Sequence, residues 1–263
     1  MRAELAHSVL VKASGECNSR RMTGPPVWAG VAAAAICLGT AACGGASTTS
    51  VTGSGSVVSR DIPVSSFSRL KVGRSFDVRV SVGAAETVTV HVDDNLVDEL
   101  DVGVSGDTLH VDLKSGTSIS NATLKADVTV RALENMNASG ASSISLADGI
   151  EAEMLSVTLS GASRLDGRIK TSDGRLEASG ASRARLTGSA TSLDVTQSGA
   201  SGLEAEDLAV ASLVIDLSGA STAAVTVTDT ISADLSGASQ LRYVGSPQFS
   251  RKEISGASSI TGL

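Results

Sequence analysis

Aromatic residues are scarce in this sequence: three Phe, one Tyr and one Trp make up 2% of its 263 residues. Aromatic side chains usually dominate cores and anchor binding faces, so the interior here must be built from small aliphatic residues. Histidine and cysteine occur only three times each. The cysteines at positions 17, 37 and 43 provide no disulfide framework, and the histidines provide little material for a catalytic or metal centre.

Basic residues are also in short supply. The chain has 28 acidic and 21 basic residues, for a formal net charge of −7. This balance argues against a nucleic-acid partner, because nothing on the surface would neutralise the phosphates. No zinc-site, phosphate-binding or Gly-x-Ser-x-Gly pattern occurs, so we predict no metal, no cofactor and no catalytic residues. Glycine, in contrast, is abundant, with 27 residues.

Residues 1–42 are typical of a lipoprotein-type signal peptide. A pair of arginines at positions 20 and 21 precedes an apolar run, 27–38, which is shorter than the about 20 residues of a membrane span. The small residues before Cys43 resemble a bacterial lipobox, in which the chain is cut before a lipidated cysteine, although Thr40 replaces the usual leucine. We therefore predict a diacyl anchor on Cys43, with an unmodified thiol as the alternative.

The remainder of the chain predicts a tether and one domain. Residues 43–56 are rich in Gly, Ser and Thr without apolar periodicity, which is typical of a flexible tether. Residues 57–263 predict the domain, with an N-terminal β part (57–131) followed by repeats (132–263). Alternating apolar residues predict strands in five segments of the N-terminal part, and one helical turn is expected after Asp93. The five segments are 67–72, 76–82, 87–92, 109–113 and 126–130.

The tetrapeptide Ser-Gly-Ala-Ser occurs seven times and is the strongest signal in the sequence. Successive copies are 21, 19, 19, 20, 18 and 19 residues apart. Apolar residues recur at alternate positions in phase with each copy, as in strands with one buried face. The glycines of the seven copies are Gly140, Gly161, Gly180, Gly199, Gly219, Gly237 and Gly256.

A unit of this length cannot bury its own apolar face, but units stacked about 4.8 Å apart can. We therefore predict an all-β fold, a parallel β-solenoid whose first open edge is closed by the N-terminal β part. Each Ser-Gly-Ala-Ser would form a structural corner: glycine permits a positive φ or a close backbone approach, and stacked serines satisfy backbone groups. A serine-rich ligand or glycan-attachment ladder is the alternative.

Several short motifs occur in the order of a known family. They are Gly53-Ser54-Gly55-Ser56-Val57-Val58, Leu70-Lys71-Val72-Gly73, Ser75-Phe76-Asp77-Val78, Asp93-Asp94-Asn95-Leu96 and Gly106-Asp107-Thr108-Leu109, followed by the repeats. Over residues 53–263 the chain resembles the "putative auto-transporter adhesin, head GIN domain" family, a domain of unknown function in bacterial surface proteins and lipoproteins. The resemblance implies a right-handed β-helix on the outer face of a membrane, and it supplies no catalytic residues.

One group of charged residues is a candidate binding feature. Asp216, Asp234 and Glu253 each precede a corner glycine by three residues, so they should stack as an acidic ladder in consecutive turns. Such a ladder would bind a cation or face a basic partner, unless nearby Arg or Lys side chains neutralise it. A second set, which alternates in sign, predicts an exterior ion ladder of Asp166, Arg185 and Glu204. His91 and His110 lie on alternating strands and predict a polar strand face.

The sequence as a whole predicts a non-enzymatic, lipid-anchored β-solenoid of the cell envelope with an adhesive, structural or scaffolding role. A carbohydrate-active β-helix enzyme and an extracytoplasmic sensor or accessory module are the alternatives. The enzyme would need sugar-stacking aromatics, and the repeats contain only Tyr243 and Phe249. The expected partners are the membrane, through the anchor, and a protein or a glycan.

The carboxy-terminal end of the repeats predicts a further partner. The seventh repeat stops part-way, which would leave Ile254, Ile260 and Leu263 at an open solenoid end. A second copy of the chain covering this end would make a homo-oligomer. The competing solution is that segment 245–251 folds across the end within one chain.

Overall fold

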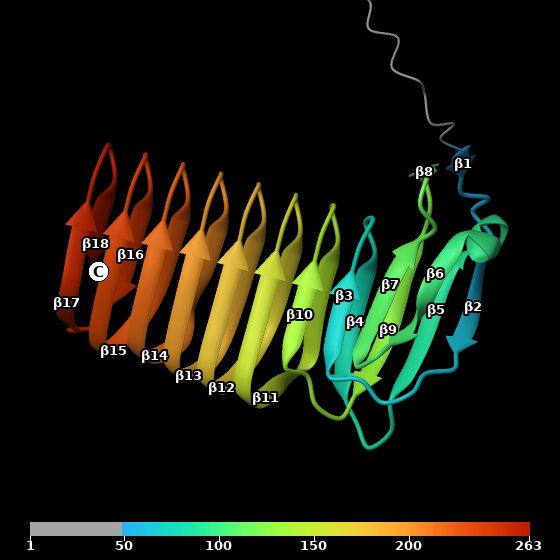
Figure 1. Ribbon diagram of the computed structural model, residues 1–263, viewed down its shortest axis with the longest axis horizontal. Helices are drawn as coiled ribbons and strands as arrows, with labels where there is room; N and C mark the ends of the chain where they lie inside the picture. The colour runs from blue at the N-terminus through green and yellow to red at the C-terminus, as the bar shows by residue number, and fades with distance from the viewer. Residues whose placement is uncertain (1–48) are drawn as a thin grey trace, which may run out of the picture. The chain divides into compact units, whose positions relative to one another are not determined.

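The structure is a computed structural model that describes residues 49–263, and in it an N-terminal β part leads into a parallel β-solenoid (Figure 1). The predicted fold class is confirmed. The N-terminal part consists of β1 (Thr49–Thr52), β2 (Val57–Ile62), β3 (Arg69–Val72), β4 (Asp77–Val82), β5 (Thr87–Asp93), the 3₁₀ helix η1 (Asp94–Glu99), β6 (Leu100–Ser105), β7 (Thr108–Leu113), β8 (Thr117–Ser120) and β9 (Leu124–Val130). No helix among these described residues is long and apolar enough to cross a membrane.

The solenoid strands follow without helices. They are β10 (Asn135–Ala138), β11 (Ser143–Leu159), β12 (Arg164–Ala178), β13 (Arg183–Gln197), β14 (Gly202–Leu217), β15 (Thr222–Leu235), β16 (Gln240–Val244), β17 (Gln248–Ile254) and β18 (Ser259–Gly262). Each of β11 to β15 continues around a bend, so that its first half lies on one face and its second half on another. The five strands expected in the N-terminal part are β3, β4, β5, β7 and β9, and the expected helical turn is η1.

Residues 49–56 differ from the flexible tether that their composition predicts. β1 pairs in parallel with β8, with Thr49 opposite Thr117. Asp93, which is 1% exposed, then holds the turn that follows: its carboxylate accepts hydrogen bonds from the backbone N–H groups of Gly55 (2.8 Å) and Thr123 (2.7 Å). Because these contacts are hydrogen bonds to the backbone, they require no alternating apolar residues, and the sequence of this segment therefore does not reveal them. The rest of the tether and Cys43 lie outside the described residues.

The N-terminal part supplies turns of the solenoid itself. β3 lies between β7 and β10, parallel to both, and β4 lies in the same way between β9 and β11. The turn made by β3 and β4 is therefore inserted between the first repeat and the turn made by β7 and β9, which come later in the chain. Beyond this turn, β6 pairs antiparallel with β7, β5 pairs antiparallel with β9, and β2 pairs antiparallel with β5. These three strands close this end of the stack.

Parallel pairing in register stacks side chains of successive turns into columns. One buried column consists of Ile144, Leu165, Ala184, Leu203, Ala223 and Leu241. The narrow interior explains why small aliphatic residues suffice for the core. Another column is interrupted by Gln197, between Ala178 and Leu217, and its buried amide nitrogen and oxygen have no hydrogen-bond partner. Burying such an amide unpaired costs about 1–3 kcal/mol.

The Ser-Gly-Ala-Ser corners stack on one another through their backbones. All seven glycines have a positive φ, between 68° and 77°. In six successive pairs of corners the alanine N–H donates to the glycine carbonyl of the turn before, at 2.7 Å. A Cβ atom added to a stacked glycine would run into that same carbonyl, at 2.5 Å for Gly180 and 2.6 Å for Gly199. Glycine is required at this point because the corners approach too closely for a side chain.

The last serine of each corner is used inside the corner. In the first six corners this serine is buried, and its hydroxyl donates to the carbonyl of the first serine of the same corner. The bond from Ser163 to Ser160 is 2.6 Å long, for example. These buried hydroxyls satisfy backbone carbonyls and are not accessible for the attachment of a glycan.

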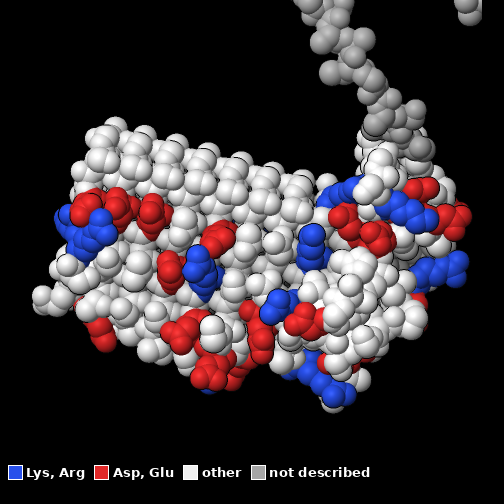
Figure 2. All heavy atoms as spheres, viewed as in Figure 1, with Lys and Arg blue, Asp and Glu red and all other residues white. Residues whose placement is uncertain are grey.

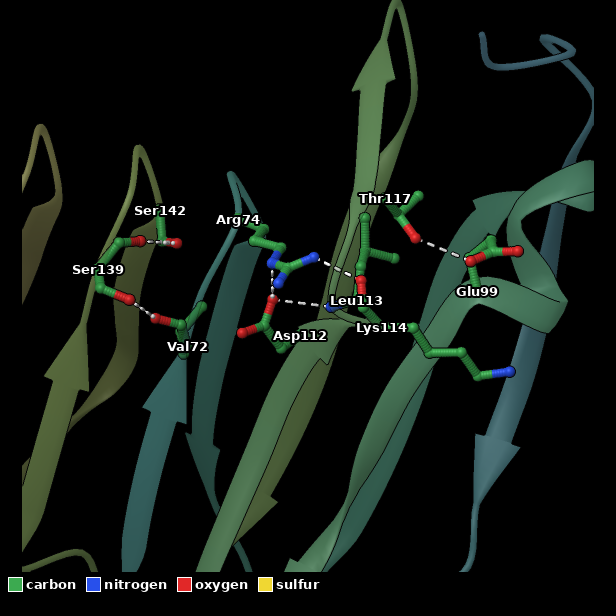
Figure 3. A network of polar contacts seen from close by, with 9 residues as sticks. All are labelled: Val72, Arg74, Glu99, Asp112, Leu113, Lys114, Thr117, Ser139 and Ser142. Carbon is green, nitrogen blue, oxygen red and sulfur yellow. Dashed lines mark hydrogen bonds and ion pairs between the residues drawn. The ribbon is translucent and has the colours of Figure 1, made fainter. Parts of the chain in front are cut away.

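One corner has another residue in place of the glycine. It shows which of two requirements, the positive φ or the close approach of a stacked carbonyl, excludes a side chain. The register places Arg74, with φ 48°, opposite Gly140. The neighbouring turn on the other side has the long segment 114–123, which contains β8, in place of a stacked corner, and the Arg74 side chain reaches the start of this segment. Its guanidinium pairs with Asp112 at 3.2 Å and donates to the Lys114 carbonyl at 2.5 Å (Figure 3). A positive φ alone therefore accommodates a side chain, whereas a stacked carbonyl does not.

We predict that Gly199→Ala destabilises the domain more than Gly140→Ala. A Cβ at Gly140 would meet the backbone nitrogen of Arg74 at 3.3 Å, which a small shift relieves, so the positive φ is the main cost, at about 1 kcal/mol. At Gly199 the carbonyl clash adds to this, for roughly 2–4 kcal/mol. Urea unfolding followed by circular dichroism measures both variants. Equal losses would contradict the carbonyl mechanism.

At the carboxy-terminal end the last turn stays open. β17 pairs with β15 and β18 with β16, so segment 245–251 continues the solenoid and does not fold across its end. Ile254 is 44% exposed. Lys252 stands in register with the buried Ala233, and its ammonium lies 5.1 Å from the ring centre of Phe249. A charge such as that of Lys252 at a sheet edge opposes pairing with the edge of another sheet. An exposed apolar residue such as Ile254 favours this pairing.

The prediction that a second copy covers this end can be tested by sedimentation of residues 49–263. If it is correct, the fragment forms a dimer, and Ile260→Lys converts the dimer to a monomer without loss of the strand signal in circular dichroism. A wild-type fragment that stays monomeric at all concentrations contradicts the prediction.

Candidate functional site

The acidic ladder has the register that its spacing predicts. Asp216 on β14 is opposite Asp234 on β15, which in turn is opposite Glu253 on β17. The guanidinium of Arg251 joins the last two carboxylates, at 3.2 Å from Asp234 Oδ2 and 2.9 Å from Glu253 Oε2. Within residues 49–263 no group of three or more His, Cys, Asp or Glu side chains could hold a metal ion. The geometry is that of a solvent-exposed face in which one guanidinium partly offsets three carboxylates, and Asp216 forms no ion pair among the described residues.

The contact between Arg251 and Glu253 shifts the pKa of both groups. The pKa of Glu253 is lowered from its ordinary value, first by the hydrogen bond from Arg251 and then by its positive charge. The pKa of Arg251 is raised, chiefly by the same hydrogen bond. Arg175 and Glu177 form an equivalent pair at 2.8 Å, which raises the pKa of Arg175. These pairs are exposed, so they add little to stability.

We predict that Arg251→Ala raises the pKa of Glu253 towards its ordinary value. A lowered carboxyl pKa contributes stability above the unfolded-state value, and this contribution is lost as the pH falls through the folded-state value. In the variant the two pKa values nearly coincide, so this small contribution to stability, and its loss on acidification, should largely disappear. A pH titration of the Glu253 carboxyl carbon by NMR measures the shift, with Arg175→Ala as the control that leaves Glu253 unchanged. Identical titrations in wild type and Arg251→Ala would disprove the assignment.

The residues of the expected ion ladder are neighbours in register, but they do not form ion pairs with one another. Asp166 is opposite Arg185, and Arg185 is opposite Glu204, but no ion pair joins them in the described part of the chain. Long side chains on an exposed sheet face gain little from being fixed in one geometry, which explains why register alone does not produce contacts.

The structure also brings together a serine, a histidine and an aspartate that the sequence analysis did not connect. His91 on β5 has its Nδ1 2.8 Å from the Ser59 hydroxyl on β2 and its Nε2 2.9 Å from Asp127 Oδ2 on β9. These residues are more than 30 positions apart in the chain, and only the antiparallel pairing of β2, β5 and β9 unites them. The same residue types form the catalytic triads of hydrolases.

The surroundings of this trio differ from those of a catalytic serine. His91 and Asp127 border a shallow hollow of about 330 Å³, but Ser59 does not line it and is exposed on an outer strand. A nucleophilic serine needs a substrate pocket and donors for the developing oxyanion. We interpret the trio as a cross-strand polar network. His110, which lies 3.4 Å from Asp101 on the adjacent strand, makes a similar contact, in agreement with the predicted polar strand face.

Two larger hollows adjoin each other where β11, β12 and β13 bend. Their volumes are about 730 and 660 Å³, and both are lined by Glu151, Ala152 and Glu153. Short side chains at the bends, such as Ala190 and Ser172, leave this part of the surface concave. The sequence analysis missed this groove, because the side chains that form it come from different repeats.

Residues 66–247 match the family described as "Putative auto-transporter adhesin, head GIN domain". The chain belongs to this family. No curated protein sequence matches the chain. Among solved structures, a "putative adhesin" from Bacteroides fragilis has a TM-score of 0.75 and 20% identity, covering 81% of this chain and 100% of its own. These values show a common fold.

Two further solved structures are similar to this head GIN domain. A "putative adhesin" from Parabacteroides merdae has a TM-score of 0.67 and 18% identity, covering 81% of this chain and 99% of its own. A "putative lipid binding protein" from Parabacteroides distasonis has a TM-score of 0.68 and 18% identity, covering 82% and 100%. The differing names go with one architecture, so the fold alone does not specify the ligand.

Proposed function

We propose that this head GIN protein is a lipid-anchored surface protein that adheres to its partner without catalysis. The observation that carries the proposal is the stacked solenoid. Backbone hydrogen bonds join every turn to the next, so exposed side chains are held at a fixed spacing along an extended surface. Repetitive surfaces of this kind are used for binding, because contacts with one partner can be spread over many turns.

The polar groups of the described residues support binding over catalysis. The carboxylates at the distal end of the acidic ladder are tied to Arg251, and Ser59 does not line the hollow that His91 and Asp127 border. The aromatic rings of Tyr243 and Phe249 pack edge to face, with centroids 5.5 Å apart, and line none of the hollows described above. No observation therefore favours the carbohydrate-active alternative.

The anchor is part of the proposal because adhesion requires the domain to stay on the cell. Cys43 lies six residues before Thr49, where the first strand begins. The family description names an auto-transporter adhesin, which is a type of surface protein. Two acyl chains on one cysteine suffice for stable attachment. A lipid-anchored domain on the outer face of the membrane can then present its solenoid to glycans or proteins of the surroundings.

The proposal predicts that Cys43→Ser releases the protein and abolishes adhesion. The full chain is expressed in a bacterium that processes lipoproteins, and cells are tested for binding to immobilised glycans and matrix proteins. Wild type should be membrane-bound, carry a diacylglycerol mass increment and increase cell binding. Cys37→Ser, which changes a cysteine of the signal peptide, is the matched control. Retention of Cys43→Ser in the membrane would refute the lipid anchor. If cells that express the wild type bind no more strongly than cells without the protein, or if the protein cleaves the immobilised glycans, the non-catalytic adhesive role is refuted.

A further inference from the structure

The larger hollow at the bends of the solenoid combines an apolar floor with an acidic rim. Met154 is 68% exposed there, more than any other large apolar side chain among residues 49–263. It lines the hollow together with Ala132, Ala152 and the buried Leu155. A lone exposed methionine needs no explanation, but one within a hollow of about 730 Å³ offers an adaptable apolar contact.

The rim of this hollow has an excess of negative charge. Its two bases pair with acids outside it: Arg69 with Asp107 at 3.2 Å, and Arg175 with Glu177 at 2.8 Å, although Arg175 is also in register with Asp194 of the rim. Four acids of the rim form no ion pair in the described part of the chain. They are Glu134, Glu153, Asp173 and Asp194. Figure 2 shows acidic side chains gathered at the lower edge of this face, where β11, β12 and β13 bend.

The rim is held in place by the bends. The buried Thr171 has its hydroxyl 3.1 Å from the carbonyl oxygens of both Glu153 and Asp173, which belong to adjacent turns. Asp173 is in register with Met154, so one acid stands directly beside the apolar contact. The backbone that carries these carboxylates is therefore in place before a ligand binds, so its ordering adds no cost to binding.

We propose that this groove binds a basic polypeptide segment that carries an apolar side chain. The apolar side chain packs on Met154, and flanking Lys or Arg residues reach Glu153, Asp173 and Glu134. Charge complementarity selects such a segment over an acidic one. The groove has no aromatic residue to stack a sugar. A basic segment of this kind is the class of partner that the proposed adhesion would use. The biological role of the groove rests on the proposed function, whereas the binding itself does not.

The proposal is tested with the purified full chain and short fluorescent peptides in an anisotropy assay at low and high salt. The probe has a Leu flanked by Lys and Arg, and its two controls replace the Leu by Ala or the bases by Glu. The basic Leu peptide should bind, more weakly at high salt, and the Glu peptide should not. Replacing Leu by Ala, or Met154 by Ser, should weaken binding about tenfold.

Two charge reversals of equal size separate the groove from general electrostatics. Glu153→Lys should weaken binding of the basic Leu peptide at least threefold at low salt, roughly as expected for one lost close charge pair. Glu204→Lys makes the same substitution at an exposed residue outside the groove and should leave binding unchanged. Equal losses in the two variants, or equal binding of the Leu and Ala peptides, would overturn the proposal. The assay needs neither membrane nor cells, so its outcome is independent of the anchoring and adhesion experiments.

Discussion

The hydrogen bond from each corner alanine to the glycine carbonyl of the turn before is the constraint on which the solenoid depends. It brings the backbones of successive corners so close that no Cβ fits between them. With the corners locked, the strands on both sides are held in register, turn after turn. The small aliphatic core, the buried corner serines and the exposed rows of charge all follow from that register.

Register alone does not decide what exposed side chains do. Asp216, Asp234 and Glu253 form a ladder because the turns align, yet Arg251 from within the last turn pairs with the two carboxylates at its distal end. Asp166 and Arg185 are aligned as well and remain apart. On an open sheet face the solvent competes for every charge, so close pairs form only where side-chain geometry favours them.

The bends opposite the corners have a different character. The corners repeat one tetrapeptide, whereas the bends vary from turn to turn in length and composition, with register shifts in β11, β13 and β14. Variation at the bends leaves Met154 exposed beside free carboxylates. A uniform scaffold with one variable edge is a common way to carry binding residues on a rigid frame.

The amino-acid sequence by itself determined the repeating part of this protein. A pattern that recurs about every 19 residues sets the strand parity, the corner and the core column of each turn, because each turn contacts only its neighbours. Only the tertiary structure decided the rest. It inserted β3 and β4 between later strands, ordered residues 49–56 through Asp93, and joined Ser59, His91 and Asp127. These contacts, like the groove around Met154, link residues without a shared period, so no local pattern in the sequence records them.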